Sequence, residues 1–132
     1  MSSLLSDDIG TDLNTEKMEI IDLLVALGVC QNIAKILICL HKYGPSKSVE
    51  LQKKCNLRQP DVSIAINRLN ELGVLKTALT IRNGRGRPSH IYELSMSLRD
   101  AMMPFRNQAN EKLAIMQSQL SRLSELVKLN SN

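Results

Sequence analysis

The sequence predicts a mainly α-helical protein that carries a small β-hairpin and ends in a long helix. Three observations predict this fold class. Apolar residues recur at helical spacing through most of residues 15–72. Residues 74–81 and 90–94 alternate more nearly as strands do, and a glycine-rich stretch joins them. After residue 96, an apolar residue returns every three or four positions on an otherwise polar segment.

The chain has 132 residues, which is the size of one small domain. Hydrophobic residues make up 43% but aromatic residues only 2%, so the core must be aliphatic. No apolar run is long enough to cross a bilayer. The first residues are acidic rather than basic, which argues against a signal peptide. We therefore expect a cytoplasmic protein with no membrane partner.

Residues 1–14 are polar and lack periodicity, so they are predicted to form a mobile acidic tail. A first helix is predicted from Thr15, whose hydroxyl can cap it, to Gly28, which ends it. Its expected inner face is Ile20, Leu23, Leu24 and Leu27.

A second helix is predicted over residues 31–42, before the break at Tyr43-Gly44-Pro45. Its expected inner face is Ile33, Ile36, Leu37 and Leu40. A short third helix should run from Ser46 to about Cys55, with inward-facing Val49, Leu51 and the stem of Lys54.

A fourth helix is predicted to begin at Pro60, which suits the first helical position, and to end at Gly73. Its expected buried stripe is Val62, Ala65, Ile66, Leu69 and Leu72. The third and fourth helices are separated by a turn of a few residues, as in a helix-turn-helix. The predicted hairpin that follows completes the arrangement called a winged helix, here over residues 15–95.

Residues 96–132 are predicted to form one long helix, with Pro104 as a point of interruption. Such a narrow stripe is closer to a coiled-coil seam than to a domain core. A second copy of the chain is the natural partner, which predicts a homodimer. The alternative is that the helix folds back over its own domain. The stripe is Met102, Phe105, Ala109, Leu113, Met116, Leu120, Leu123 and Val127.

Charge is distributed unevenly along the chain. Residues 1–22 hold six acidic residues and one lysine, a net charge of −5, and the remaining residues carry +9. Residues 72–92 hold one lysine, three arginines and no acid. This pattern favours a polyanionic partner such as double-stranded DNA, although a basic solvated surface would have the same composition.

The tip of the hairpin reads Ile-Arg-Asn-Gly-Arg-Gly-Arg-Pro-Ser-His-Ile, residues 81–91. Glycines keep such a tip thin, and arginines on a thin tip suit the narrow minor groove of A·T-rich DNA. Arg85-Gly86-Arg87-Pro88 also resembles the AT-hook, a short minor-groove motif. The alternative is a turn that needs glycine and carries arginine for solubility. We expect Arg82, Arg85 and Arg87 to contact DNA and His90 to add a phosphate contact.

The predicted fourth helix has polar residues on the side away from its buried stripe. Asn and Gln can pair bidentately with adenine and Arg with guanine, and Ile can touch a thymine methyl group. A solvated helix face would look the same by composition. The candidate base-reading residues are Arg58, Gln59, Ser63, Ile64, Asn67 and Arg68.

Residues 27–94 resemble the winged-helix domain of prokaryotic transcription regulators of the TrmB-like, MarR-like and ArsR-like superfamily, with the archaeal TrmB-like pattern closest. The resemblance rests on Leu27-Gly28, Gly44-Pro45, Glu50-Leu51, the run from Leu69 to Leu75, and Gly86-Arg87-Pro88 with Tyr92. It implies dimeric, sequence-specific DNA binding. By position, Gln59, Ser63, Asn67 and Arg68 would read the major groove, and Arg85 and Arg87 the minor groove. The chain lacks the large sugar-binding domain of full-length TrmB proteins and the paired-cysteine metal motif of metal-sensing ArsR proteins.

The sequence shows no Ser-His-Asp set, phosphate-cradling loop or paired carboxylates, so an enzyme is not expected, nor is a cofactor or a metal site. Two alternatives remain. One is a thiol- or metal-responsive regulator of the same fold, which would act through Cys30, Cys39, Cys55 and His41. The other is a winged helix that contacts proteins of a transcription complex.

Overall fold

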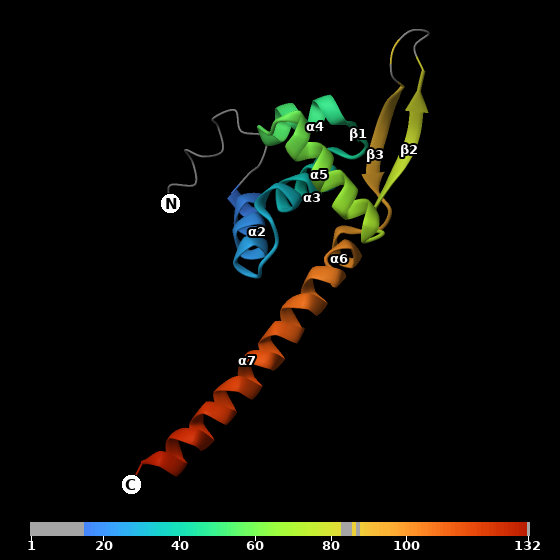
Figure 1. Cartoon of the computed structure of the whole chain (residues 1–132). Coiled ribbons are helices and arrows are strands. Elements are labelled where there is room, and N and C mark those ends of the chain that lie inside the picture. Colours follow the sequence, from blue (N-terminus) through green and yellow to red (C-terminus); the bar gives the residue numbers. More distant parts are fainter. Residues whose placement is uncertain (1–14, 83–85, 87, 132) are drawn as a thin grey trace. The chain divides into compact units, whose positions relative to one another are not determined.

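The computed structural model describes residues 15–82, 86 and 88–131. The chain divides into two compact units between Ala101 and Met102. The first unit contains helices α2 (Thr15–Ala26), α3 (Gln31–Tyr43), α4 (Ser48–Cys55), α5 (Gln59–Glu71) and α6 (Leu98–Ala101), and strands β1 (Ser46–Lys47), β2 (Leu75–Ile81) and β3 (Ser89–Leu94). The second contains α7 (Met103–Asn130) (Figure 1). The predicted fold class, a mainly helical winged helix with a long C-terminal helix, is confirmed.

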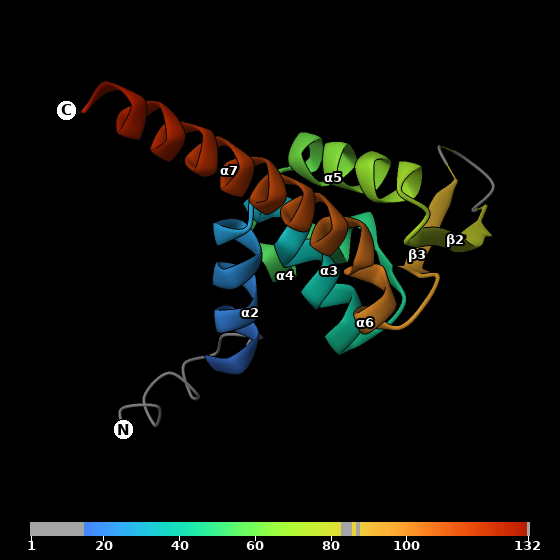
Figure 2. The ribbon, with the colours of Figure 1, turned by 90° about the horizontal axis from the view of Figure 1, so that it is seen from below.

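The central helix of the first unit is α3. It contacts α2, α4, α5, α6 and β3, and it lies between α2 and α5 in both views (Figures 1 and 2). Because neighbours surround it, its burial extends beyond the single face that the sequence predicted. Ile33, expected to face inward, is only partly buried. The buried residues of α3 are Ala34, Ile36, Leu37, Ile38, Cys39 and Leu40.

The predicted inner face of α2 was right at Leu24 and wrong at Leu23 and Leu27, and Ile20 is only partly buried. Ile21 and Leu24 are the buried residues of this helix, whereas Leu23 and Leu27 are more than half exposed. The helix also exposes Met18, so apolar residues occur on several of its sides. Helical spacing alone therefore did not identify the side that packs against α3.

The start of the third helix was also predicted wrongly. Ser46 and Lys47 form β1, which pairs with Ile91 and Tyr92 of β3, and α4 begins only at Ser48. Val49 is 55% exposed, whereas Leu51 is fully buried. Residues two positions apart on a helix point in directions that differ by about 200°, so the side chains of Val49 and Leu51 cannot both face inward.

Helix α5 follows α4 after Asn56, whose φ of 56° is left-handed and reverses the chain. Val62, Ala65, Ile66 and Leu69 of α5 are buried as predicted, while Leu72 is only partly buried. Gly73 then turns the chain into the hairpin with a φ of 79°, a conformation that costs other residues free energy.

The sheet has three strands in the order β1-β3-β2, and both neighbouring pairs are antiparallel. The register of the hairpin places Thr80 opposite His90 and Ile81 opposite Ser89, and it shifts between Thr77 and Leu79. The predicted hairpin is confirmed. Strand β1 was not predicted, and its pairing attaches the start of α4 to the middle of β3.

In the second unit, α7 begins at Met103 with Pro104 in its first turn, where proline is tolerated. Phe105 is buried. The later stripe residues Leu113, Met116, Leu120, Leu123 and Val127 are each 53–64% exposed. Within the described ranges, no helix combines the length and the apolar composition needed to cross a bilayer.

Candidate nucleic-acid interface

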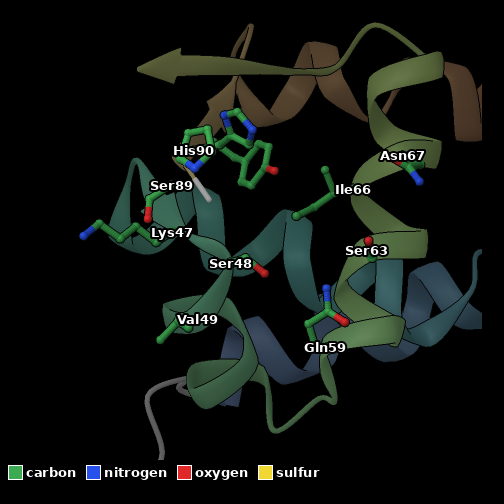
Figure 3. Close-up of a pocket in the computed structure, with 11 residues that line it drawn as sticks. Lys47, Ser48, Val49, Gln59, Ser63, Ile66, Asn67, Ser89 and His90 are labelled. Atoms are coloured by element: carbon green, nitrogen blue, oxygen red, sulfur yellow. The ribbon is translucent and has the colours of Figure 1, made fainter. Parts of the chain in front are cut away.

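A groove of about 440 Å³ lies between α5, the junction of β1 and α4, and β3. Figure 3 shows Gln59 and Ile66 of α5 on one side of it and Ser89 and His90 on the other, with the Lys47 amine directed away from α5. Among the described residues that line it, the only formally charged side chain is that of Lys47. The full lining is Lys47, Ser48, Val49, Gln59, Ser63, Ile66, Asn67, Pro88, Ser89, His90 and Tyr92.

One wall of the groove is a flank of α5. Gln59, Ser63 and Asn67 are spaced four residues apart, so they form a row along the helix. All three are exposed, and Ile66, which is buried, lies at the inner side of this row. The row offers two amides and one hydroxyl, which both donate and accept hydrogen bonds. Three of the predicted base-reading residues are therefore brought together in one groove.

The opposite wall comes from the sheet and from the start of α4. Pairing of β1 with β3 places Lys47 opposite Ile91, next to His90 in sequence. The Lys47 amide donates a 2.7 Å hydrogen bond to the Glu50 carboxylate, which fixes the first turn of α4. The Lys47 ammonium and the hydroxyls of Ser48 and Ser89 can donate to an anion here.

His90 is held at the exposed edge of this wall. Its Nδ1 lies 3.0 Å from Thr80 Oγ1, on the strand position directly opposite. Its ring also contacts Tyr92 at a centroid distance of 6.1 Å. These contacts orient the imidazole through Nδ1 and the ring face, and the ring lines the groove, where it can approach a ligand.

Ile64 lies away from this groove. It is 68% exposed and lines a second, smaller depression of about 60 Å³ with Cys30, Asn32, Ile33, Asp61 and Ala65. A residue adjacent to Ser63 is rotated by about 100° on a helix. The predicted base-reading set is therefore divided between two sides of α5.

The two arginines predicted on α5 and its N-terminal end are each paired with an acid. Arg58 Nε lies 3.4 Å from Asp61 Oδ2, and Arg68 Nη1 lies 3.5 Å from Glu71 Oε1. Both guanidinium groups are well exposed. Such surface pairs are weak, so each arginine can exchange its carboxylate for a phosphate.

At the hairpin, Arg82 is exposed and directly follows β2. The predicted contacts at Arg85 and Arg87 lie outside the described residues. Gly86 between them has a φ of 88°, and a Cβ there would meet no atom within 4 Å. Glycine is thus required at this position by its backbone and not by crowding.

Sequence reasoning missed the groove-lining residues Lys47, Ser48, Ser89 and Tyr92. Lys47 and Ser48 were predicted to lie in the third helix. Ser48 does begin α4, whereas Lys47 belongs to β1, and a strand of two residues has no detectable period. Their only signal was the Gly44-Pro45 break just before them, which indicates a change of direction but not a strand pairing.

No site for a metal ion is found in residues 15–82, 86 and 88–131, since no group of three His, Cys, Asp or Glu side chains lies close enough to hold one. Cys30 is exposed, whereas Cys39 and Cys55 are buried. His41 is exposed near the end of α3.

No protein-family model matches the sequence, and no curated protein matches it. Several solved structures share its fold. A MarR family regulator from Neisseria meningitidis matches with a TM-score of 0.51 and 16% identity over 94% of each chain. A Methanosarcina mazei protein described as a possible transcriptional regulator matches with a TM-score of 0.50 and 19% identity over 87% of this chain and 89% of that one.

A further MarR family transcription regulator matches with a TM-score of 0.50 and 16% identity over 86% of this chain and 75% of that one. At these identities the likeness shows a shared winged-helix fold. The predicted closeness to the TrmB-like group stays a prediction.

Proposed function

We propose that this chain is a transcription regulator that binds double-stranded DNA as a homodimer. In this proposal α5 enters the major groove and the hairpin of β2 and β3 lies along the adjacent minor groove. The proposal is supported by the winged-helix fold that the chain shares with the regulators described above. It is also supported by the hydrogen-bonding side chains that line the groove.

The observation that carries the proposal is the chemistry of the groove between α5 and the sheet. Gln59 and Asn67 present amides that suit the edge of adenine, and Ser63 suits several bases. Lys47, Ser48 and Ser89 supply donors for phosphate on the facing wall. Groups that suit base edges and groups that suit phosphate thus line the same groove, which supports the proposal of a DNA-binding surface.

The minor-groove part of the proposal rests on Arg82, Arg85 and Arg87 and on the two glycines, Gly84 and Gly86, that lie among them in the sequence. The φ of 88° at Gly86 favours a residue without Cβ, which keeps this position free of a side chain. Arginine is favoured where the minor groove is narrow and its potential most negative. We therefore propose a preference for A·T-rich DNA beside the sequence read by α5.

Dimerisation is proposed through α7. Its exposed stripe repeats at the three- and four-residue spacing of a coiled-coil seam, from Leu113 to Val127. A row of apolar residues this long on a polar helix is typical of a protein interface. Two chains joined in this way would place two copies of α5 on half-sites about one helical turn of DNA apart.

The experiment is a fluorescence-anisotropy titration of A·T-rich and mixed-sequence duplexes at several salt concentrations. We expect the logarithm of the association constant to fall linearly with the logarithm of the salt concentration. Each phosphate contact should add about 0.9 to the steepness of this slope. The Arg85→Ala/Arg87→Ala protein should lose both affinity and the A·T preference.

The matched control is Arg99→Ala/Arg122→Ala, which removes the same charge from exposed positions on α6 and α7. It should keep the A·T preference. Salt-dependent binding that ignores the Arg85/Arg87 change would contradict the minor-groove assignment. Absence of binding to every duplex would contradict DNA binding and favour a protein-interaction module.

A further inference from the structure

Cys39 in α3 and Cys55 at the end of α4 form a buried thiol pair that the proposed function does not use. Their Sγ atoms lie 2.9 Å apart, less than about 1 Å beyond the length of a disulfide bond. The two residues are 0% and 4% exposed. Cys30, in contrast, is exposed and lies in the depression beside Ile64.

We propose that Cys39 and Cys55 are the site of an intramolecular disulfide that fastens α4 to the central helix. The bond would close a ring across 16 positions of the chain, and this ring contains Gly44, Pro45, β1 and nearly all of α4. The first helix of the helix-turn-helix would thus be held covalently to the core.

The geometry makes this pair a structural crosslink rather than a conformational switch. Because the sulfur atoms are already in contact, the bond needs only a small shift of the two helices. Neither cysteine lines the groove between α5 and the sheet. Formation of the disulfide bond should therefore stabilise the fold and leave the groove unchanged.

The bond can form by exchange with a small-molecule disulfide. The thiolate of one cysteine attacks a sulfur of that disulfide and expels one small thiolate, which leaves a mixed disulfide. The second cysteine attacks the mixed disulfide and expels the other. Two protein thiols are oxidised, the small disulfide is reduced to two thiols, and these take up the two protons.

The folded, reduced protein should resist this reaction. The hydrogen bond with Cys39, together with burial, raises the pKa of the Cys55 thiol far above its usual range. The Cys55 thiol also lies 3.6 Å from the carbonyl oxygen of Lys35. Since only the thiolate attacks, exchange should be fast while the chain folds, before α4 packs, and slow afterwards.

The test is to refold the reduced full-length chain with oxidised glutathione and, in parallel, to expose the folded reduced protein to the same mixture. Peptide mapping by mass spectrometry without reductant should find Cys39 linked to Cys55 in the refolded sample, while the folded sample forms this link much more slowly. The oxidised protein should unfold at a temperature higher by on the order of 10 °C than the reduced one.

The control variants are Cys30→Ser, which should retain the link and the rise in unfolding temperature, and Cys55→Ala, which should lose both. Three unlinked cysteines after refolding, or links that involve Cys30, would overturn the proposal. Equal rates in the folded and refolding samples would overturn it as well, because the pair would then not be protected. The mapping uses the wild-type chain, so it is informative even if Cys55→Ala does not fold.

Discussion

Asn67 and Lys47 line the same groove from opposite walls, and they should act on DNA in different ways. The Asn67 amide can satisfy the donor and acceptor of one base edge, whereas the Lys47 ammonium can approach any phosphate. The first contact depends on sequence and the second does not. This difference makes the proposed roles of the two walls separable by substitution.

Asn67→Ala should weaken binding to the preferred sequence by roughly tenfold, since one bidentate base contact discriminates by about 1–3 kcal/mol. It should leave the salt dependence unchanged. Lys47→Ala should weaken binding to all sequences and reduce the salt slope by about 1. Anisotropy titrations of a selected site and of a scrambled duplex measure both effects. Identical behaviour of the two variants would contradict this division of roles.

Leu51 and Val49 lie two positions apart on α4, yet only Leu51 is buried. Leu51→Ala should lower the free energy of unfolding by about 2–5 kcal/mol, because it opens a cavity in the core. Val49→Ala should change it by about 0.5 kcal/mol or less, as is usual at exposed positions. Urea denaturation measures both values, and similar losses would mean that Val49 packs inward after all.

The elements differ in how far the sequence determines them, for physical reasons. The buried stripe of α5 repeats at regular helical spacing over about two turns, so Val62, Ala65, Ile66 and Leu69 were identified correctly. The inner face of α2 was identified only at Leu24, because apolar side chains occur on several sides of this helix and only contact with α3 selects one. Strand β1 exists through its pairing with β3, and no local pattern reports such pairing.

The candidate site was also predictable from the sequence only in part, namely where its residues lie on a regular helix. Gln59, Ser63 and Asn67 followed from the helical spacing of α5, whereas the position of Lys47 depends on the unpredicted strand β1. Ile64 was grouped with the base-reading residues because it lies off the predicted buried stripe and could touch a thymine methyl group, and the structure places it in a separate depression. The contacts predicted for Arg85 and Arg87 stay a prediction from the sequence.

The connection between α5 and the hairpin depends on the left-handed backbone of Gly73. A Cβ at this position would meet no atom within 4 Å, but φ is 79°. Gly73→Ala should therefore destabilise the fold through backbone strain alone, by about 1–2 kcal/mol. Asn70→Ala, at an exposed position near the end of α5, should cause no loss, since alanine is the better helix former. A thermal melt that showed no difference between these variants would contradict the role of Gly73.

At the scale of the whole molecule, the proposal requires two chains. Met116→Glu/Leu123→Glu places charges on the exposed stripe of α7 and should convert a dimer into a monomer. The monomer should bind a two-half-site duplex at least tenfold more weakly, because the two half-sites are then bound independently. Sedimentation equilibrium and anisotropy measure these effects.

The matched control is Ser118→Glu, which adds a charge to α7 at a position rotated away from the stripe. It should remain dimeric. A wild-type chain that sediments as a monomer at every concentration would contradict dimerisation through α7, while leaving DNA binding by the first unit to be judged on its own titrations.

The most direct test of the central claim is an amide chemical-shift map of the isotopically labelled chain on addition of duplex DNA. The proposed interface predicts the largest changes at Lys47 and Ser48, along Gln59, Ser63 and Asn67, and at His90, with α2 little affected. Changes confined to α2 or α7, with none on either wall of the groove, would contradict the claim that this groove binds DNA.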